Sequence, residues 1–205
     1  MFYDAIENRH GLRHDPFKAL IAPRPIGWIS SVGADGAVNL APYSFFNAVS
    51  ENPHILMFAS TGRKDSLTNV EETGEFVWNL ATFALRDKMN MTSATAPRHV
   101  NEFELAGLTQ APSRLVKPPR VGESPAALEC KHLQTIDLAD LDGIPVDRHM
   151  VLGQVVGVHI DDAFIHDGLV DTAALKPIAR LGYKDYSVVE EVFQLTRPKA
   201  AALTG

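Results

Sequence analysis

The sequence predicts a mainly β protein in which a closed or nearly closed β-barrel carries peripheral helices. Three observations lead to this fold class. Many short runs of β-branched and aromatic residues follow one another, turn residues separate them, and only a few segments have helical spacing. The chain has 205 residues, of which 45% are hydrophobic and 21% charged. This is enough apolar surface for one core, so we expect a single domain over residues 1–205.

The first predicted element is a hairpin near the N-terminus. Ile26–Val32 is rich in β-branched and aromatic residues, and Gly33–Gly36 supplies a turn that tolerates positive φ. Ala37–Ala41 then returns as the partner strand. After the break at Asn52-Pro53, the continuous apolar run His54–Ala59 predicts a central strand that is covered on both faces.

Short helices are predicted after this strand. Asp65–Glu72 has helical spacing, with Asp65 or Ser66 to cap its first amides and Gly74 to end it. The other elements of this region are a strand and two more short helices, over residues 76–81, 85–93 and 98–105.

The two clearest late strands are Ala126–Leu138 and Met150–Ile160, joined by a turn over Asp140–Asp147. They predict a long hairpin. Because glycine weakens a strand, Gly153 and Gly157 indicate bulges or places where backbone or ligand comes close.

Two segments lack regular patterning. Residues 111–122 form a long loop, and loops of that length are often functional or interfacial. The segment from Gly182 onward mixes polar and apolar residues, and we expect residues 199–205 to be frayed.

Charge and hydropathy exclude two classes of partner. The formal net charge is -6, and the basic residues are scattered along the chain. We therefore expect neither nucleic acid nor membrane as a partner. Met1–Leu20 carries charges throughout, and no apolar stretch approaches the roughly 18 residues of a spanning helix. These features predict a cytoplasmic protein.

Cysteine and histidine content favours neither a disulfide nor a metal centre. Cys130 is the only cysteine, so it cannot form an internal disulfide, and its apolar neighbours predict a buried strand thiol. Among the eight histidines, His10 and His14 have the i, i+4 spacing of two ligands on a helix, but Gly11 weakens that helix. We predict no metal site.

Hydroxyls, a glycine and two cations lie between a predicted buried strand and a helix start. The stretch contains Ser60, Thr61, Gly62, Arg63, Lys64, Asp65 and Ser66. Free amides at a helix N-terminus attract an anion, and Arg63 or Lys64 supplies the opposite charge, so a phosphate suits this place. The alternative is an ordinary solvated turn in which Asp65 pairs with a cation and caps the helix.

A second cluster of interest is Asn39–Asn47, which mixes amide, hydroxyl and aromatic groups. A flat heteroaromatic ligand needs apolar faces and a polar edge, and this stretch offers both. The alternative is that Phe45 and Phe46 are surface and core residues on alternating faces of a strand.

Arg24, which precedes the first predicted strand, either binds a phosphate or is a surface charge or structural ion pair. No Gly-x-Gly-x-x-Gly follows a strand and no Gly-Lys-Ser/Thr loop is present. A Rossmann or P-loop nucleotide site is therefore not expected.

Three motifs together resemble the flavin reductase-like, or flavoredoxin-like, family. They are Arg24-Pro25-Ile26-Gly27-Trp28-Ile29-Ser30, Asn39-Leu40-Ala41-Pro42-Tyr43-Ser44-Phe45-Phe46-Asn47, and Gly62-Arg63-Lys64-Asp65-Ser66 with Asn69. Ala179-Arg180-Leu181-Gly182 with Tyr186-Ser187 is similar to the C-terminal signature of the same family. Three motifs in order within about fifty residues are far more specific than one. The resemblance covers about residues 17–189, with terminal extensions outside it.

The resemblance implies a split β-barrel homodimer that holds FMN near the subunit interface. Ser44, Phe45 and Asn47 would lie along the edge of the isoalloxazine ring. The resemblance and the phosphate-like turn assign the ribityl chain and phosphate to Arg24, Ser30, Ser60, Thr61, Arg63, Lys64 and Ser66. His149 and Tyr183 would line the ring, and they are the possible catalytic residues. Trp78 and Tyr183 depart from the residues expected in the family, which would narrow the ring pocket.

The resemblance also implies a reaction. We expect an NADH- or NADPH-dependent flavin oxidoreductase that passes electrons to free flavin, oxygen or a partner monooxygenase. No side-chain acid or base is obligatory, because the cofactor carries the chemistry. Three alternatives stay open: an FMN electron carrier that does not use reduced nicotinamide, a flavin-free binding module, and an activity like that of pyridoxamine phosphate oxidase.

Overall fold

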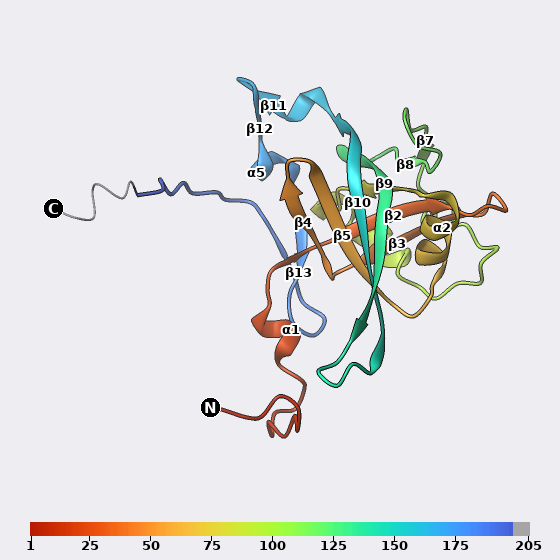
Figure 1. The fold of residues 1–205 in the computed structure, drawn as a ribbon. Helices are drawn as coiled ribbons and strands as arrows, with labels where there is room; N and C mark the ends of the chain where they lie inside the picture. Colours follow the sequence, from red (N-terminus) through yellow and green to blue (C-terminus); the bar gives the residue numbers. More distant parts are fainter. Residues whose placement is uncertain (199–205) are drawn as a thin grey trace.

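A computed structural model describes residues 1–198 of the chain. Its main feature is an antiparallel seven-stranded sheet in the order β3-β2-β6-β9-β10-β5-β4. The strands are β2 (Gly27–Val32), β3 (Val38–Tyr43), β4 (Phe46–Glu51), β5 (His54–Thr61), β6 (Glu75–Asn79), β9 (Ala126–Ala139) and β10 (Pro145–Ile160). The long β9–β10 hairpin crosses the whole molecule, and its turn projects beyond the body (Figure 1).

Short ladders lie around this sheet. A three-stranded sheet joins β1 (Arg24–Pro25), β13 (Ile178–Arg180) and β14 (Tyr186–Val188), so it brings an early segment of the chain beside a late one. Two further pairs are β7 (Gln110–Ala111) with β8 (Arg120–Val121), and β11 (Ile165–His166) with β12 (Leu169–Val170).

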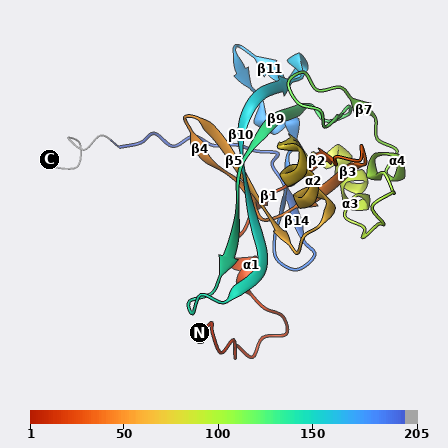
Figure 2. The same ribbon diagram turned by 45° about the vertical axis from the view of Figure 1, so that its right-hand side comes forward.

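The helices are short and peripheral. They are α1 (Phe17–Leu20), α2 (Asp65–Thr73), η1 (Phe83–Leu85), α3 (Arg86–Met91), α4 (Glu102–Leu105), η2 (Asp162–Phe164) and α5 (Thr172–Leu175). Helices α2, α3 and α4 lie on the same side of the β9–β10 hairpin (Figure 2). Within residues 1–198, no helix has both the length and the apolar character needed to cross a membrane.

Two apolar clusters hold these elements together. One lies under α3 and α4, where the fully buried Trp28 and Phe103 pack with Met89. The other lies beneath α2, where the Phe58 and Phe76 rings meet edge to face at 5.5 Å. Both clusters pack against β2, so this strand fixes the position of α2 relative to α3.

Both predicted hairpins are confirmed. Strand β2 pairs with β3, and β9 pairs with β10 over nearly their whole length. The register shifts where Gly153 and Gly157 enter β10, as the glycines predict. Cys130 is fully buried in β9, and burial raises the pKa of its thiol, which agrees with a structural role.

Strand β5 corrects one expectation. It was predicted to be covered on both faces, but only alternate residues, including Leu56 and Phe58, are buried. The side chains of the other face, including Ile55 and Met57, are partly exposed. An apolar run does not by itself show whether a second layer covers its outer face.

The N-terminal cap of α2 also differs from the expectation. The helix ends at Gly74 with φ 73°, as predicted, but Lys64 occupies the N-cap position and no side chain caps the first amides. Asp65 instead accepts from Arg98 at 3.1 Å, and Ser66 accepts from Asn39 at 2.7 Å. The two side chains expected to cap the helix therefore bind residues that are distant in the sequence.

The remaining segments differ mainly in extent. The helix expected over 85–93 is η1 followed by α3, and that expected over 98–105 is only α4. The 111–122 loop contains the β7–β8 pair, and three of its amides donate to the buried Glu129 carboxylate: Arg114 at 2.8 Å, Leu115 at 2.6 Å and Val116 at 3.1 Å. The predicted fraying of 199–205 lies outside the described residues.

Candidate functional site

The turn between β5 and α2 forms one end of the candidate site. Gly62, with φ 71°, reverses the chain after β5, and the Lys64 amide donates to the Gly62 carbonyl at 3.1 Å. The nine-residue helix α2 begins directly after this turn. Its start has no side-chain cap, and it opens onto a pocket of about 330 Å³. Because unpaired amides and the helix dipole favour an anion, this end suits a phosphate.

The charges around this pocket are unevenly distributed. Arg63 forms an ion pair with Glu71, whereas Lys64 has no ion-pair partner within residues 1–198. At the base lie Tyr43 and Glu102, whose pKa values are both raised by burial and by the charge of Asp65. Lys64 is the cation available to an incoming anion.

Two smaller pockets continue from this one. The first, of about 210 Å³, shares Pro42 and Ser93 with the phosphate-like pocket and contains Ser44. The second, of about 220 Å³, shares Lys18, Arg24 and Ser44 with the first. The three pockets adjoin one another through these shared residues, and together we call them the main groove, which runs from the start of α2 to the β3–β4 connection.

The far end of the main groove is lined by the β3–β4 connection. Both phenylalanines line the groove, but Phe45 is 44% exposed, whereas Phe46 is buried and stacks on Trp78 with ring centroids 5.8 Å apart. Phe45 is thus a surface residue and Phe46 a core residue. The Asn47 side-chain oxygen accepts from the Ala48 amide at 2.8 Å, which orients its NH₂ group outward from that bond.

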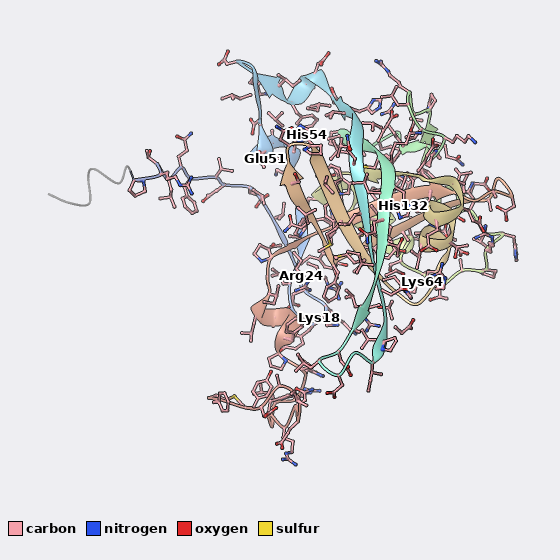
Figure 3. All side chains as sticks on the ribbon, in the orientation of Figure 1. Lys18, Arg24, Glu51, His54, Lys64 and His132 are labelled. Atoms are coloured by element: carbon pink, nitrogen blue, oxygen red, sulfur yellow. The ribbon has the colours of Figure 1, made fainter. Side chains whose placement is uncertain are left out.

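The structure brings eight of the predicted residues to the main groove. They are Arg24, Ser44, Phe45, Asn47, Arg63, Lys64, Ser66 and Tyr183. Figure 3 shows Lys18 and Arg24 near one another and Lys64 on the side of α2. Residues from four separate parts of the chain therefore meet along one groove.

Arg24 lines the main groove, but its guanidinium is engaged with the backbone. It donates to the carbonyls of Lys18, Ile21 and, at 2.8 Å, Leu181. Burial, and then the nearby Arg180, lower its pKa. Of the two roles left open by the sequence, these contacts match the structural one, although the partners are carbonyls and not a carboxylate.

Three predicted hydroxyl residues lie outside the main groove. The Ser30 hydroxyl is buried and donates to the Pro119 carbonyl at 2.6 Å. The Ser60 hydroxyl, also buried, donates to the Gly62 carbonyl at 2.8 Å, so it stabilises the turn itself. Thr61 is exposed at the end of β5, opposite Arg148. Their contacts do not support direct binding by Ser30 or Ser60.

The two possible catalytic residues differ in placement. His149 lies on β10 opposite Ser60, and its Nδ1 is 2.6 Å from Asp137 Oδ1, while its Nε2 is 3.6 Å from Asp147 Oδ1. It does not line the main groove. Tyr183 does line it, with φ 55°. Glycine adopts that backbone most readily, which explains why a glycine is expected at this position, and Tyr183 occupies it at some cost in backbone strain.

Other groove residues escaped the sequence interpretation. They are Lys18, Ser93, Glu102, Arg180 and Tyr186. Arg180 and Tyr186 belong to the C-terminal signature, which was the available signal for them. Lys18 had none, because it lies in the short helix α1 and is held beside the late segment by Arg24, which donates to the carbonyls of both Lys18 and Leu181.

Comparisons with known proteins agree with this geometry. An uncharacterised protein of Aquifex aeolicus is 38% identical over 173 residues, covering 82% of this chain and 85% of that one. The crystal structure of nitrilotriacetate monooxygenase component B from Bacillus cereus is 32% identical with a TM-score of 0.85, covering 95% and 98%. A split barrel domain from Shewanella frigidimarina, 23% identical, has a TM-score of 0.80 over 89% and 90%, which shows the fold.

The family model of the flavin reductase like domain matches residues 20–174, which span the main sheet and most of the main groove. The mainly β architecture with peripheral helices is the split barrel expected of that family. The chain therefore belongs to the flavin reductase-like domain family.

Proposed function

We propose that this protein binds FMN in the main groove and acts as an NADH- or NADPH-dependent flavin reductase. The observation that carries this proposal is the succession of adjoining pockets from an uncapped helix start beside Lys64 to the aromatic and polar Ser44–Asn47 segment. A phosphate needs free amides and positive charge, whereas a flat ring needs an apolar face. One end of the groove suits the phosphate and the other end suits the ring.

Different residues are suited to the phosphate and to the ring. Lys64 supplies a full positive charge to the phosphate, and Arg63 adds to it while paired with Glu71. The Ser66 hydroxyl, fixed by Asn39, lines the same pocket. At the far end, Phe45 provides an apolar face, and Ser44 and Asn47 provide polar groups for a ring edge.

FMN held there would supply the hydride-accepting chemistry. The protein's part is to hold the ring, keep one face accessible and place donors where negative charge develops on reduction. Ser44 and Asn47 are suited to the last task, since both line the ring end. We assign no obligatory acid or base to His149, because it lies outside the main groove.

The similarity to nitrilotriacetate monooxygenase component B supports a partner monooxygenase as the destination of the electrons. The rival proposal is an FMN electron carrier. Anaerobic mixing of the FMN-loaded protein with NADH or NADPH distinguishes them: the reductase loses its yellow absorbance, whereas a carrier stays oxidised. A cytoplasmic location remains a prediction of the sequence.

We also propose a homodimer. The outward faces of β4, β9 and β10 expose apolar side chains, including Val49, Leu133 and Val158. Exposed apolar residues of this kind on strands of one sheet suit burial by a second copy. Light scattering after size exclusion tests it, and a monomer at micromolar concentration would contradict the proposal.

Flavin titration tests the phosphate end of the main groove. FMN and riboflavin differ by the phosphate, so Lys64→Gln is expected to weaken FMN about tenfold, the loss of about 1.4 kcal/mol of charge-assisted binding. Riboflavin affinity is expected to stay the same. Lys117→Gln, which removes an exposed lysine outside the groove, is the control. An equal effect on both flavins would show that Lys64 does not contact the phosphate.

A further inference from the structure

Asp65 places a negative charge beside the proposed phosphate position. It is the first residue of α2, and it lines the same pocket as Lys64 and Ser66. Because Arg63 is already paired with Glu71, this carboxylate would largely cancel the charge that Lys64 offers to a phosphate. The pocket suits an anion only if another group offsets the charge of Asp65.

Arg98 supplies this offsetting charge. Its Nη1 atom donates to Asp65 Oδ1 at 3.1 Å, while its Nε and Nη2 atoms donate to the two carboxylate oxygens of Asp35 at 3.1 Å and 3.3 Å. A third carboxylate, that of Glu72, lies 3.8 Å from Nη2. The two bonds to Asp35 fix the plane of the guanidinium, so Nη1 is held toward Asp65. Arg98 does not line the pocket itself, and it therefore acts on the pocket through Asp65.

Gly33 makes room for this arrangement. A Cβ atom added at Gly33 would lie 2.5 Å from Arg98 Nη2 and 2.6 Å from Asp35 Oδ1, so a side chain there would displace one of the two. Glycine is the residue that allows other groups to approach the backbone so closely. The turn between β2 and β3 thus accommodates the ion pair of Arg98 and Asp35 in its observed position.

Arg98 also holds the segment that forms one wall of the pocket. Residues 92–96 line the pocket, and Arg98 follows two residues later. At the near end, the Thr92 hydroxyl accepts from Trp28 Nε1 at 2.9 Å. Within residues 1–198, the hydrogen bonds that residues 93–100 make to distant parts of the chain all come from Arg98. Arg98 thus influences the pocket in two ways, through the charge of Asp65 and through the position of this wall.

We propose that Arg98 is a positioning residue for the phosphate end of the main groove, and that it acts by cancelling the charge of Asp65. The inference rests on the proposed flavin function. Two observations favour the charge over the wall. Arg98 is the only cation that pairs with Asp65 in the part of the chain that the structure describes, whereas Thr92 holds the wall without it. With Asp65 neutralised, Lys64 and the free amides of α2 present net positive charge to a phosphate monoester.

Titrations of FMN and riboflavin test this role, because the two flavins differ by the phosphate. In Arg98→Gln the dissociation constant of FMN is expected to rise about tenfold and that of riboflavin to change less than about twofold. Adding Asp65→Asn removes the uncompensated carboxylate, so the double variant should return the FMN constant to within about threefold of the wild type. Arg114→Gln, which removes an exposed arginine outside the groove, is the control and should alter neither constant.

Asp65→Asn alone gives a second measure that does not depend on the fold of Arg98→Gln. Exposed ion pairs contribute little to stability, so Arg98→Gln is expected to stay folded, and urea denaturation checks this. The single Asp65→Asn variant leaves the Arg98 charge less fully compensated. FMN should therefore bind it about threefold more tightly than the wild type, with riboflavin affinity unchanged. Weaker FMN binding in Asp65→Asn would contradict the charge role.

The remaining outcomes separate this inference from the flavin proposal. An equal loss for both flavins in Arg98→Gln, or no recovery in the double variant, would show that Arg98 acts only by holding the wall, and the inference would be wrong. Unchanged FMN affinity in Arg98→Gln would also overturn it, while the flavin proposal would stand. If the wild type binds no flavin, the flavin proposal fails, and inorganic phosphate titrated into the same proteins decides the inference. Phosphate binding that Arg98→Gln weakens and Asp65→Asn restores supports it, and any other result overturns it.

Discussion

The Arg24 guanidinium donates to the Leu181 carbonyl at 2.8 Å, and this bond joins an early and a late segment of the chain beside the main groove. The same side chain reaches the carbonyls of Lys18 and Ile21, so one buried residue fixes α1, β1 and the end of β13. Because Lys18 and Tyr183 both line the pocket next to Ser44, the shape of that pocket depends on Arg24.

Replacing Arg24 is therefore expected to destabilise the protein. Arg24→Met leaves three carbonyls without their donor, and we expect a loss of about 2–4 kcal/mol in the free energy of unfolding. Arg24→Lys keeps the charge but not the fork, so its loss should be smaller. Urea denaturation measures both. A fully stable Arg24→Met variant would mean that water replaces the guanidinium at no cost.

A second prediction concerns Gly153. A Cβ at this position would overlap the ring of Phe76, which is fully buried and packed edge to face on Phe58. Since that ring has no room to move, Gly153→Ala is expected to cost about 1–3 kcal/mol. The matched control is Gly157→Ala, whose Cβ would approach Glu129 Cβ at 3.3 Å and needs only a small adjustment. Equal losses in urea denaturation would rule out overpacking against Phe76 as the cause.

Local pattern predicted the hairpins because each depends on residues close in sequence. Turn glycines fix β2–β3, and the bulge glycines of β10 mark its irregular places. Strand β4 was not separated from the Asn39–Asn47 stretch, since a short strand mixing exposed and buried residues gives little periodicity. The β1–β13–β14 sheet was also missed, because β1 and β13 are far apart in sequence and the β13 and β14 strands have only three residues each.

The residues of the candidate site were also predictable only where they depend on local sequence. Lys64 and Ser66 were accessible to sequence reasoning because a strand, a glycine turn and a helix start are consecutive. Ser30 and Ser60 share the residue type of a ligand, but their hydroxyls are used by nearby carbonyls. Whether a serine binds a ligand or the backbone depends on its tertiary neighbours, which motif spacing does not specify.

Glu102 makes stability depend on pH. Burial, and then Asp65, raise its pKa in the folded protein. A raised carboxyl pKa means that its contribution to stability is full below the unfolded pKa and is lost as pH rises through the folded pKa. Glu102→Gln keeps an acceptor for the Leu40 amide but does not ionise. It should therefore be more stable than the wild type at pH 8, with the advantage shrinking toward pH 4.5. A constant difference in urea midpoint at both pH values would contradict this.

Asn47→Ala separates the ring end of the main groove from the phosphate end. The Asn47 side chain lines the pocket with Phe45, far along the groove from Lys64, and only its oxygen is used within residues 1–198. If its NH₂ group meets the flavin ring, the substitution removes a contact that FMN and riboflavin share. Both dissociation constants should then rise by a similar factor, about three- to tenfold, which corresponds to about 0.7–1.4 kcal/mol for one hydrogen bond.

Steady-state NADH oxidation is measured on the same Asn47→Ala variant at saturating FMN, so that changed flavin retention does not obscure the rate. Ser113→Ala serves as control, since that hydroxyl donates to the Pro118 carbonyl outside the groove. The flavin potential should become more negative in Asn47→Ala if the amide stabilises charge on the reduced ring. Unchanged affinity for both flavins together with unchanged NADH oxidation would remove Asn47 from the site, and a loss confined to FMN would place it at the phosphate instead.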